Sequence, residues 1–222
     1  YAISIKGREK AREALDRSQY AGPAPVTLQT YIAAMARQSL KGFTVHQRTM
    51  RQALGQMVMN ERTFNQIGPA VNSGKSIFLY GPPGDGKTTI AEAVGRMILN
   101  SDISVPYAIE VDGAIIKVFD QSNHERVAEP ATLAFKSRDL RWVKVHRPVI
   151  ITGGELTLET LDLVWDEVNN YYQAPYQMKA NGGMFLIDDF GRQQVRPRDL
   201  LNRWILPLEK RVDYLTLHTG RK

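Results

Sequence analysis

The chain has 222 residues, of which 43% are hydrophobic, so it can bury one sizeable core with a small appendage. It contains no cysteine, no apolar run near about 18 residues and no signal-peptide pattern, which excludes a disulfide framework and predicts neither secretion nor a membrane span. We therefore expect one main domain in a cytoplasmic protein.

The net charge of +6 belongs entirely to the first 62 residues, which hold ten Lys and Arg against four Asp and Glu, while the remainder holds 19 of each sign. If any part of the chain meets an acidic partner such as nucleic acid, it is this basic segment. A solvated basic helix face explains the same pattern without a partner, and the sequence leaves both interpretations open.

Residues 1–58 are expected to form a basic N-terminal helical segment in front of a core at 59–222. Residues 6–17 look helical but have almost no apolar stripe. Apolar residues then recur at helical spacing in residues 28–40 and again in residues 50–58. These two short helices have two interpretations. They could form half of a helix-turn-helix, or they could be ordinary packed helices.

The rest of the chain is organised around residues 76–89. Residues 76–80 are apolar and predict a strand, and residues 88–99 predict a helix. The loop between them has glycines and a lysine at the G-x-x-x-x-G-K-[ST] spacing, which is typical of a P-loop. The expected ATP-binding residues are Gly81, Pro82, Pro83, Gly84, Asp85, Gly86, Lys87, Thr88 and Thr89.

Each part of this loop has a chemical reason. The glycines let the backbone turn tightly and point its N–H groups inward, and the positive end of the following helix adds to an anion site. Lys87 is expected to reach the β- and γ-phosphates, and the Thr88 hydroxyl is expected to complete the shell of a Mg²⁺ that those phosphates hold.

Two regions after this helix predict strands. Residues 105–120 contain two β-rich runs around Asp112-Gly113, which is a hairpin signal. Residues 147–154 predict a second core strand, and the leucines of residues 156–165 predict the next helix.

An acidic strand is the expected partner of the loop. Four apolar residues at 184–187 precede Asp188 and Asp189, which predicts a buried parallel strand that delivers both carboxylates to the site. Asp188 is the candidate Mg²⁺ ligand. Asp189 is the candidate that orients or deprotonates the attacking water.

The last part of the chain predicts a helix at residues 198–210, with Pro197 in its first turn, and then a strand at residues 211–218. Several arginines follow the acidic strand and suit either contact with a neighbour's phosphate or simple surface charge. They are Arg192, Arg196, Arg198 and Arg203.

These motifs together resemble the MoxR-like AAA+ ATPases. The likeness rests on residues 81–88, on residues 181–192, and on the helix and strand that follow, and it covers about residues 60–222. It implies an α/β P-loop NTPase fold, an AAA+ core with a parallel sheet between helices, in which the hairpin at 105–120 is an insertion. It also implies that the chain stops before the first sensor residue, the arginine finger and the helical lid.

By this resemblance the chain is expected to be an ATP hydrolase that uses Mg-ATP to remodel a protein client, working as a homo-oligomeric ring, usually a hexamer. Lys87 and Asp189 are then the catalytic residues. Asp189 stands where the family usually has Glu, and the shortened chain is expected to be poorly active alone. The alternatives are a nucleic-acid-associated ATPase that uses residues 1–62, or an ATP-binding switch that signals by oligomerising.

Overall fold

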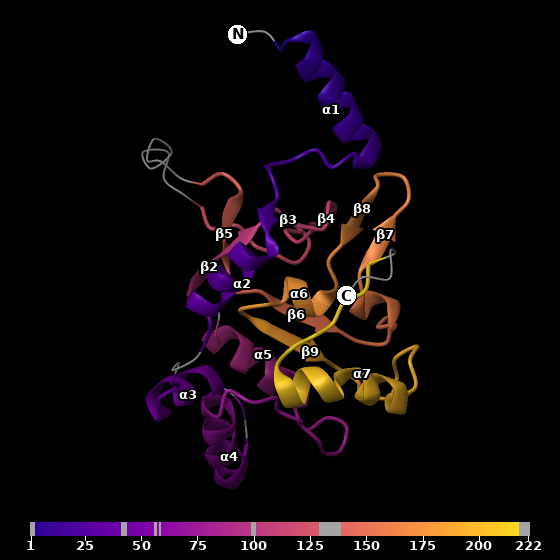
Figure 1. Ribbon diagram of the computed structural model, residues 1–222. Coiled ribbons are helices and arrows are strands. Elements are labelled where there is room, and N and C mark those ends of the chain that lie inside the picture. Colours follow the sequence, from indigo (N-terminus) through magenta and orange to yellow (C-terminus); the bar gives the residue numbers. More distant parts are fainter. Residues whose placement is uncertain are drawn as a thin grey trace.

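The computed structural model describes residues 3–40, 44–55, 57, 59–98, 101–128 and 139–217. It is an α/β structure in which sheets with parallel strands lie between helices (Figure 1), so the coarse fold expectation is confirmed. Val58, Leu99 and residue 218, which end three of the predicted elements, lie outside the described residues. Within the described ranges, no helix is both long enough and apolar enough to cross a membrane.

Capping residues set where several helices begin. Ser4, Thr27 and Asn60 each accept a hydrogen bond from the backbone N–H three residues later, at the start of α1, α2 and α4. A cap of this kind contributes about 1 kcal/mol to helix stability. The helices are α1 (Ile5–Arg17), α2 (Leu28–Arg37), α3 (Gln47–Leu54), α4 (Glu61–Asn72), α5 (Lys87–Ile98), α6 (Tyr176–Lys179) and α7 (Pro197–Lys210).

The strands form one mixed sheet and two smaller pairs. The mixed sheet has the order β1-β3-β4-β8-β7, while β2 pairs antiparallel with β5 and β6 pairs parallel with β9. The strands are β1 (Val26–Thr27), β2 (Asp102–Pro106), β3 (Ala108–Val111), β4 (Ala114–Lys117), β5 (Trp142–His146), β6 (Val149–Thr152), β7 (Val164–Asp166), β8 (Tyr171–Gln173) and β9 (Met184–Ile187).

The predicted hairpin is confirmed as β3 and β4. The two strands run antiparallel, with Val111 opposite Ala114. Asp112 and Gly113 between them have φ values of 51° and 81°. A two-residue turn with positive φ at both positions matches the twist of the flanking strands, which is why Asp-Gly was a sufficient signal.

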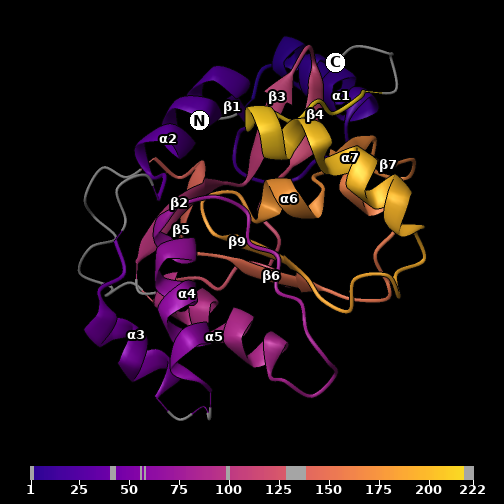
Figure 2. The ribbon, with the colours of Figure 1, turned by 90° about the horizontal axis from the view of Figure 1, so that it is seen from below.

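The parallel pair β6 and β9 lies between helices, with α5 on one side and α6 and α7 on the other (Figure 2). Successive side chains of β9 point to opposite faces. Met184 therefore packs against the second core, whereas Phe185 and Ile187 pack against the third core. The second core is Val45, Met50, Leu54, Phe64, Ile67, Ile90, Ala93, Val94 and Met97, and the third core is Leu156, Leu161, Val195 and Leu200.

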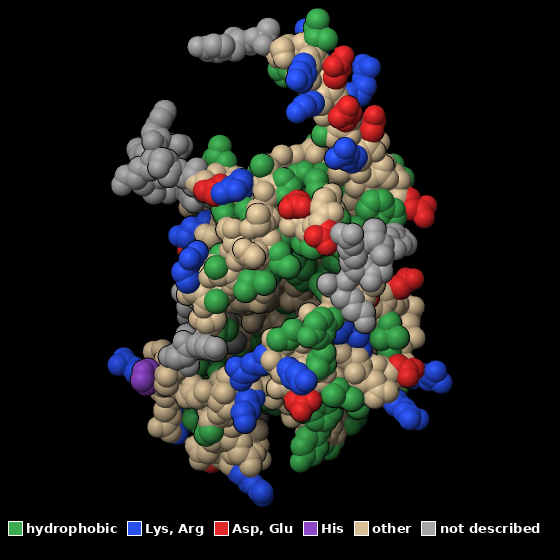
Figure 3. All heavy atoms as spheres, viewed as in Figure 1, with side chains coloured by type: hydrophobic (Ala, Val, Ile, Leu, Met, Phe, Trp, Pro, Cys, Tyr) green, Lys and Arg blue, Asp and Glu red, His purple; other side chains and the backbone are tan. Residues whose placement is uncertain are grey.

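The N-terminal segment divides into two parts. Residues of β1 and α2 belong to the first core, so their contacts cross the predicted boundary at residue 58, whereas α1 has no buried residue and projects from the rest of the chain (Figure 1). Charged side chains of both signs line α1 in Figure 3. The first core is Val26, Tyr31, Ala34, Met35, Ile103, Val105, Ile109, Ile116, Val118, Phe119, Val143, Val145, Tyr172, Ala174 and Leu217.

A buried histidine joins the turn after β4 to α6. The Nδ1 atom of His124 accepts a hydrogen bond from the Asp120 N–H (3.1 Å), so Nε2 carries the proton and donates it to the Lys179 carbonyl (2.9 Å). Burial lowers the pKa of His124. Burial alone would raise the pKa of Asp120, but hydrogen bonds, first that from the Lys179 ammonium (2.8 Å), outweigh it and lower the pKa to about 2.

Three of the predicted elements are wrong. Residues 76–80 and 211–217 form no strand, because neither segment has a ladder partner among the described residues. The helix expected at residues 156–165 is instead a short 3-10 turn, η2 (Glu159–Leu161), followed by strand β7. Here Leu161 is buried in the third core, and Trp165 of β7 lies opposite Tyr172 of β8. The leucine spacing resembles a helix, but long-range pairing decides the conformation.

Candidate functional site

The glycine-rich loop turns directly into α5. Gly84 and Gly86 have φ values of 89° and 71°, a backbone region that favours glycine. The N–H of Ile90 donates to the carbonyl of Gly86 (2.9 Å), so the first helical turn contains Lys87, Thr88 and Thr89. Since the first N–H groups of a helix have no partner within the helix, this turn presents donors to the space beside the loop.

The Lys87 side chain closes over the start of the loop. Its Nζ donates to the carbonyl of Gly81 (3.1 Å) and to that of Pro82 (2.7 Å). The only described polar partners of this ammonium are therefore carbonyl groups of the loop itself. The side chain is held near the loop by weak, neutral acceptors that a stronger anion can replace.

The loop and the acidic strand meet at one hydrogen bond. Thr88 Oγ1 donates to Asp188 Oδ2 (2.9 Å), although the two residues are 100 positions apart. The backbone N–H of Asp188 donates to the carbonyl of Thr152 (2.8 Å), which continues the β6–β9 ladder. Asp188 thus stands at the carboxyl end of β9, as predicted, and faces the first turn of α5.

The two carboxylates differ in their surroundings. Asp188 uses its second oxygen, Oδ1, to accept the backbone N–H of Asp189 (2.9 Å). The Asp189 side chain is 66% exposed, and its nearest cation is Arg192, with 3.9 Å between the charged atoms. The Asp189 backbone has a φ of 48°, in the left-handed region that few residues other than glycine adopt. Asp188 is therefore held by the loop and the strand, while Asp189 reaches into solvent.

Aromatic side chains link the two halves of the site. In residues 76–80, Leu79 packs against the second core, whereas Phe78 and Tyr80 are 68% and 85% exposed. The Phe78 ring meets the Phe190 ring edge-on, at 5.9 Å between centroids. Phe190 directly follows Asp189, so this contact joins the segment before the loop to the turn after β9.

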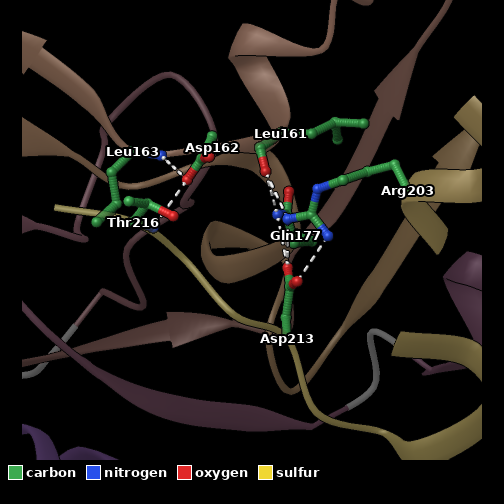
Figure 4. Close-up of polar contacts among 7 residues, drawn as sticks. All are labelled: Leu161, Asp162, Leu163, Gln177, Arg203, Asp213 and Thr216. Atoms are coloured by element: carbon green, nitrogen blue, oxygen red, sulfur yellow. Dashed lines mark hydrogen bonds and ion pairs between the residues drawn. The ribbon is translucent and has the colours of Figure 1, made fainter. Parts of the chain in front are cut away.

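Of the four arginines considered from the sequence, Arg203 serves the fold. Its Nη1 and Nη2 donate to the Asp213 carboxylate (2.6 and 2.9 Å), and Nη2 also donates to the Leu161 carbonyl (2.9 Å), as Figure 4 shows. Arg196 pairs with Asp199 on the surface of α7 (2.9 Å). Arg203 therefore points into a network that ties residues 211–217 to η2 and α6.

Sequence reasoning missed two polar residues at this edge of the sheet. Glu155 follows β6, and its carboxylate accepts the Gly153 N–H (2.9 Å), which lowers the pKa of Glu155. Gln193 is buried in the turn that follows Asp189. The position of Glu155 just past a strand parallel to β9 was a usable signal, since the carboxyl ends of neighbouring parallel strands share an edge. For Gln193 the sequence offered no such signal. Gln193 and Gln194 are adjacent and identical in type, so the sequence does not indicate which of the two is buried.

Within the part of the chain that the structure describes, no group of three or more His, Asp or Glu side chains is placed to hold a metal ion. A comparison with models of known protein families found no match for this chain, and a comparison with curated proteins found none either.

Proposed function

We propose that this chain is a P-loop ATPase with an AAA+ core that binds Mg-ATP at residues 81–89 and hydrolyses it. The observation that carries the proposal is the 2.9 Å hydrogen bond from Thr88 to Asp188. The sequence identified these two residues separately, as parts of two nucleotide motifs. Their contact supports a common site, because a chance match in either motif gives no reason for the two to meet.

Phosphate recognition in this proposal falls to the loop backbone and Lys87. The turn at Gly84 and Gly86 and the first N–H groups of α5 form an anion site with a favourable helix dipole. On binding, the Lys87 ammonium exchanges its bonds to the Gly81 and Pro82 carbonyls for bonds to phosphate oxygens. The phosphate oxygens carry negative charge whereas the carbonyls are neutral, so the ammonium gains a charge–charge attraction and the exchange favours the bound state.

The donor set at Thr88 and Asp188 fits Mg²⁺. A hydroxyl and a carboxylate oxygen lie 2.9 Å apart, and Mg²⁺ prefers hard oxygen ligands, commonly one or two from protein and the others from phosphate and water. Thr88 and Asp188 would hold the ion, which would supply positive charge against the negative charge that develops during phosphoryl transfer. The protein's part is to hold Thr88 and Asp188 in place.

Asp189 is the proposed group that orients or accepts a proton from the attacking water. Its side chain is 66% exposed and the residue directly follows Asp188 in the chain, so it is open to water next to the proposed metal ligand. The client is proposed to be a protein and the working form a ring. Both proposals rest on the resemblance to MoxR-like AAA+ ATPases rather than on any contact in this chain.

The test is a titration of the full chain with a fluorescent ATP analogue, with and without Mg²⁺. Lys87→Ala should weaken binding by about tenfold or more, the equivalent of one charge-assisted hydrogen bond. Lys75→Ala, at an exposed lysine in the turn before the loop, is the matched control and should bind as the parent does. Thr88→Val should remove the gain in affinity that Mg²⁺ provides, and Thr88→Ser, which keeps the hydroxyl, should retain it.

The proposal fails if the parent chain binds no ATP, or if Lys87→Ala and Lys75→Ala bind alike. Both lysine variants should melt at the parent temperature in the absence of nucleotide, because the described polar contacts of Lys87 lie within the loop. A large loss of stability in Lys87→Ala alone would show that the lysine is structural.

A further inference from the structure

The turn that carries Asp188 and Asp189 has an unusual backbone. Asp189 has a φ of 48° and Gly191 has a φ of 98°, so two residues of this short turn are left-handed. A non-glycine residue in that region costs about 1 kcal/mol or more, although Asp and Asn are tolerated better than most. Something in the surroundings must hold the turn in this conformation.

The side chain of Gln193 makes three hydrogen bonds to that backbone. Its Nε2 donates to the carbonyl of Asp188 (2.7 Å) and to that of Asp189 (3.1 Å). Its Oε1 accepts the N–H of Gly191 (2.7 Å). Gln193 is only 9% exposed, so its amide is withdrawn from water and depends on these bonds. Both hydrogens of the amide group are used, and both go to the residues that bear the carboxylates.

These bonds set the directions of two successive peptide planes. The carbonyl of Asp188 fixes the plane between Asp188 and Asp189, and the carbonyl of Asp189 fixes the next plane. The Arg192 N–H adds a second bond to the Asp189 carbonyl (2.9 Å). Since the Cα of Asp189 lies between these two planes, fixing them sets the direction of its Cα–Cβ bond and so limits where its carboxylate can lie.

We propose that Gln193 is a positioning residue that holds Asp188 toward Thr88 and Asp189 toward the attacking water. This inference rests on the proposed function of the site. Gln193 touches the turn only through backbone groups and reaches neither Lys87 nor the loop in any described hydrogen bond. Its loss should therefore disturb the carboxylates and leave phosphate binding by the loop in place.

The chain supplies its own matched control. Gln193→Glu keeps the shape of the side chain but removes both donors, which turns two attractive contacts with carbonyls into repulsive ones. Gln194→Glu makes the same change of charge one residue away, at an exposed position. Because position 193 is buried and position 194 is exposed, the neutral Gln193→Met variant is also needed, since it removes the bonds without adding any charge.

For the full chain we expect Gln193→Glu to lower kcat for ATP by about 10- to 100-fold, the scale of a misplacement near 1 Å, with KM changed less than about threefold. The gain in ATP affinity from Mg²⁺ should also fall, which is a readout that does not need turnover. Gln194→Glu should keep both quantities within about twofold of the parent. Gln193→Met removes the same bonds without a charge and should show the same pattern if Gln193→Glu does not fold.

Equal effects of the two glutamate variants on kcat and on the Mg²⁺ response would overturn the positioning role. So would a Gln193→Met variant with normal kcat and a normal Mg²⁺ response. If the parent chain binds no ATP, the proposed function fails, and this inference fails with it. If the parent binds Mg-ATP but the Gln193 variants keep a normal kcat and a normal Mg²⁺ response, the inference alone is wrong and the proposed function stands.

Discussion

Asp213→Asn should destabilise the fold while leaving ATP binding unchanged. The Asp213 carboxylate accepts both terminal nitrogens of Arg203 (2.6 and 2.9 Å) and the side-chain amide of Gln177 (3.0 Å). Thr216, three residues later, donates its N–H to Asp162 (3.3 Å), so the segment that follows α7 is held at two points beside η2 (Figure 4). None of these hydrogen bonds involves a residue of the loop at 81–89.

The size of the effect follows from burial. The Arg203 and Asp213 side chains are 22% and 21% exposed, so the pair is partly shielded from water. Replacing the carboxylate by an amide removes the negative charge and one acceptor, and leaves the guanidinium partly buried without a counter-charge. A hydrogen bond to a charged group contributes about 1.5–3 kcal/mol, and we expect a loss of about 2 kcal/mol after the remaining exposure is considered. For a chain of this size that lowers the melting temperature by about 4–8 °C.

Thermal and urea unfolding of Asp213→Asn and Asp199→Asn would measure the effect. Asp199 pairs with Arg196 at the surface of α7, where the two side chains are 37% and 88% exposed. Its replacement should lower the free energy of unfolding by less than about 0.5 kcal/mol. The reasoning is refuted if Asp213→Asn costs no more than Asp199→Asn. It is also refuted if Arg203→Leu lowers ATP turnover without lowering the melting temperature, because Arg203 would then be free to act on phosphate.

Three further outcomes are expected. Asp188→Asn should remove the Mg²⁺ dependence of ATP binding, whereas Asp189→Asn should keep it and lower turnover; equal loss of the Mg²⁺ response in a titration would contradict this division. Because burial lowers the pKa of His124, its contribution to stability is present above the unfolded pKa of about 6.5 and is lost as the pH falls below it; urea unfolding from pH 7 to 5 should show this slope, and His124→Gln should flatten it. Asp120 does not contribute to this slope, because its pKa of about 2 means that its contribution to stability is lost only in more acidic solutions. Deletion of residues 1–20 should leave ATP affinity unchanged, because α1 has no buried residue; salt-sensitive binding of DNA or RNA by the parent and not by the deletion would favour the nucleic-acid alternative.

Local signals in the sequence were enough for several elements. The Asp112-Gly113 turn, helix α5 after the glycine-rich loop, and helix α7 with Pro197 at its start all follow from contacts between neighbours in the chain. The same holds for β9 and its two terminal carboxylates, since a short apolar run followed by acids needs no distant information. Thr88 and Asp188 were expected in one site only because two motifs of known spacing pointed to it, and their direct hydrogen bond was not predicted.

Contacts between distant residues decided the rest. Residues 76–80 are mostly apolar but have no ladder partner among the described residues. Residues 156–165 divide between a short buried turn and the start of a strand paired to β8. The sequence does not distinguish Arg203 from the other arginines, because its partners Asp213 and Leu161 lie in other segments of the chain. It likewise does not distinguish the buried Gln193 from Gln194. A side chain's burial and its hydrogen-bond partners depend on segments that arrive from elsewhere in the chain. Residue type and spacing therefore suggested the chemistry that we propose for this site, but only the tertiary structure determined which polar groups surround its residues.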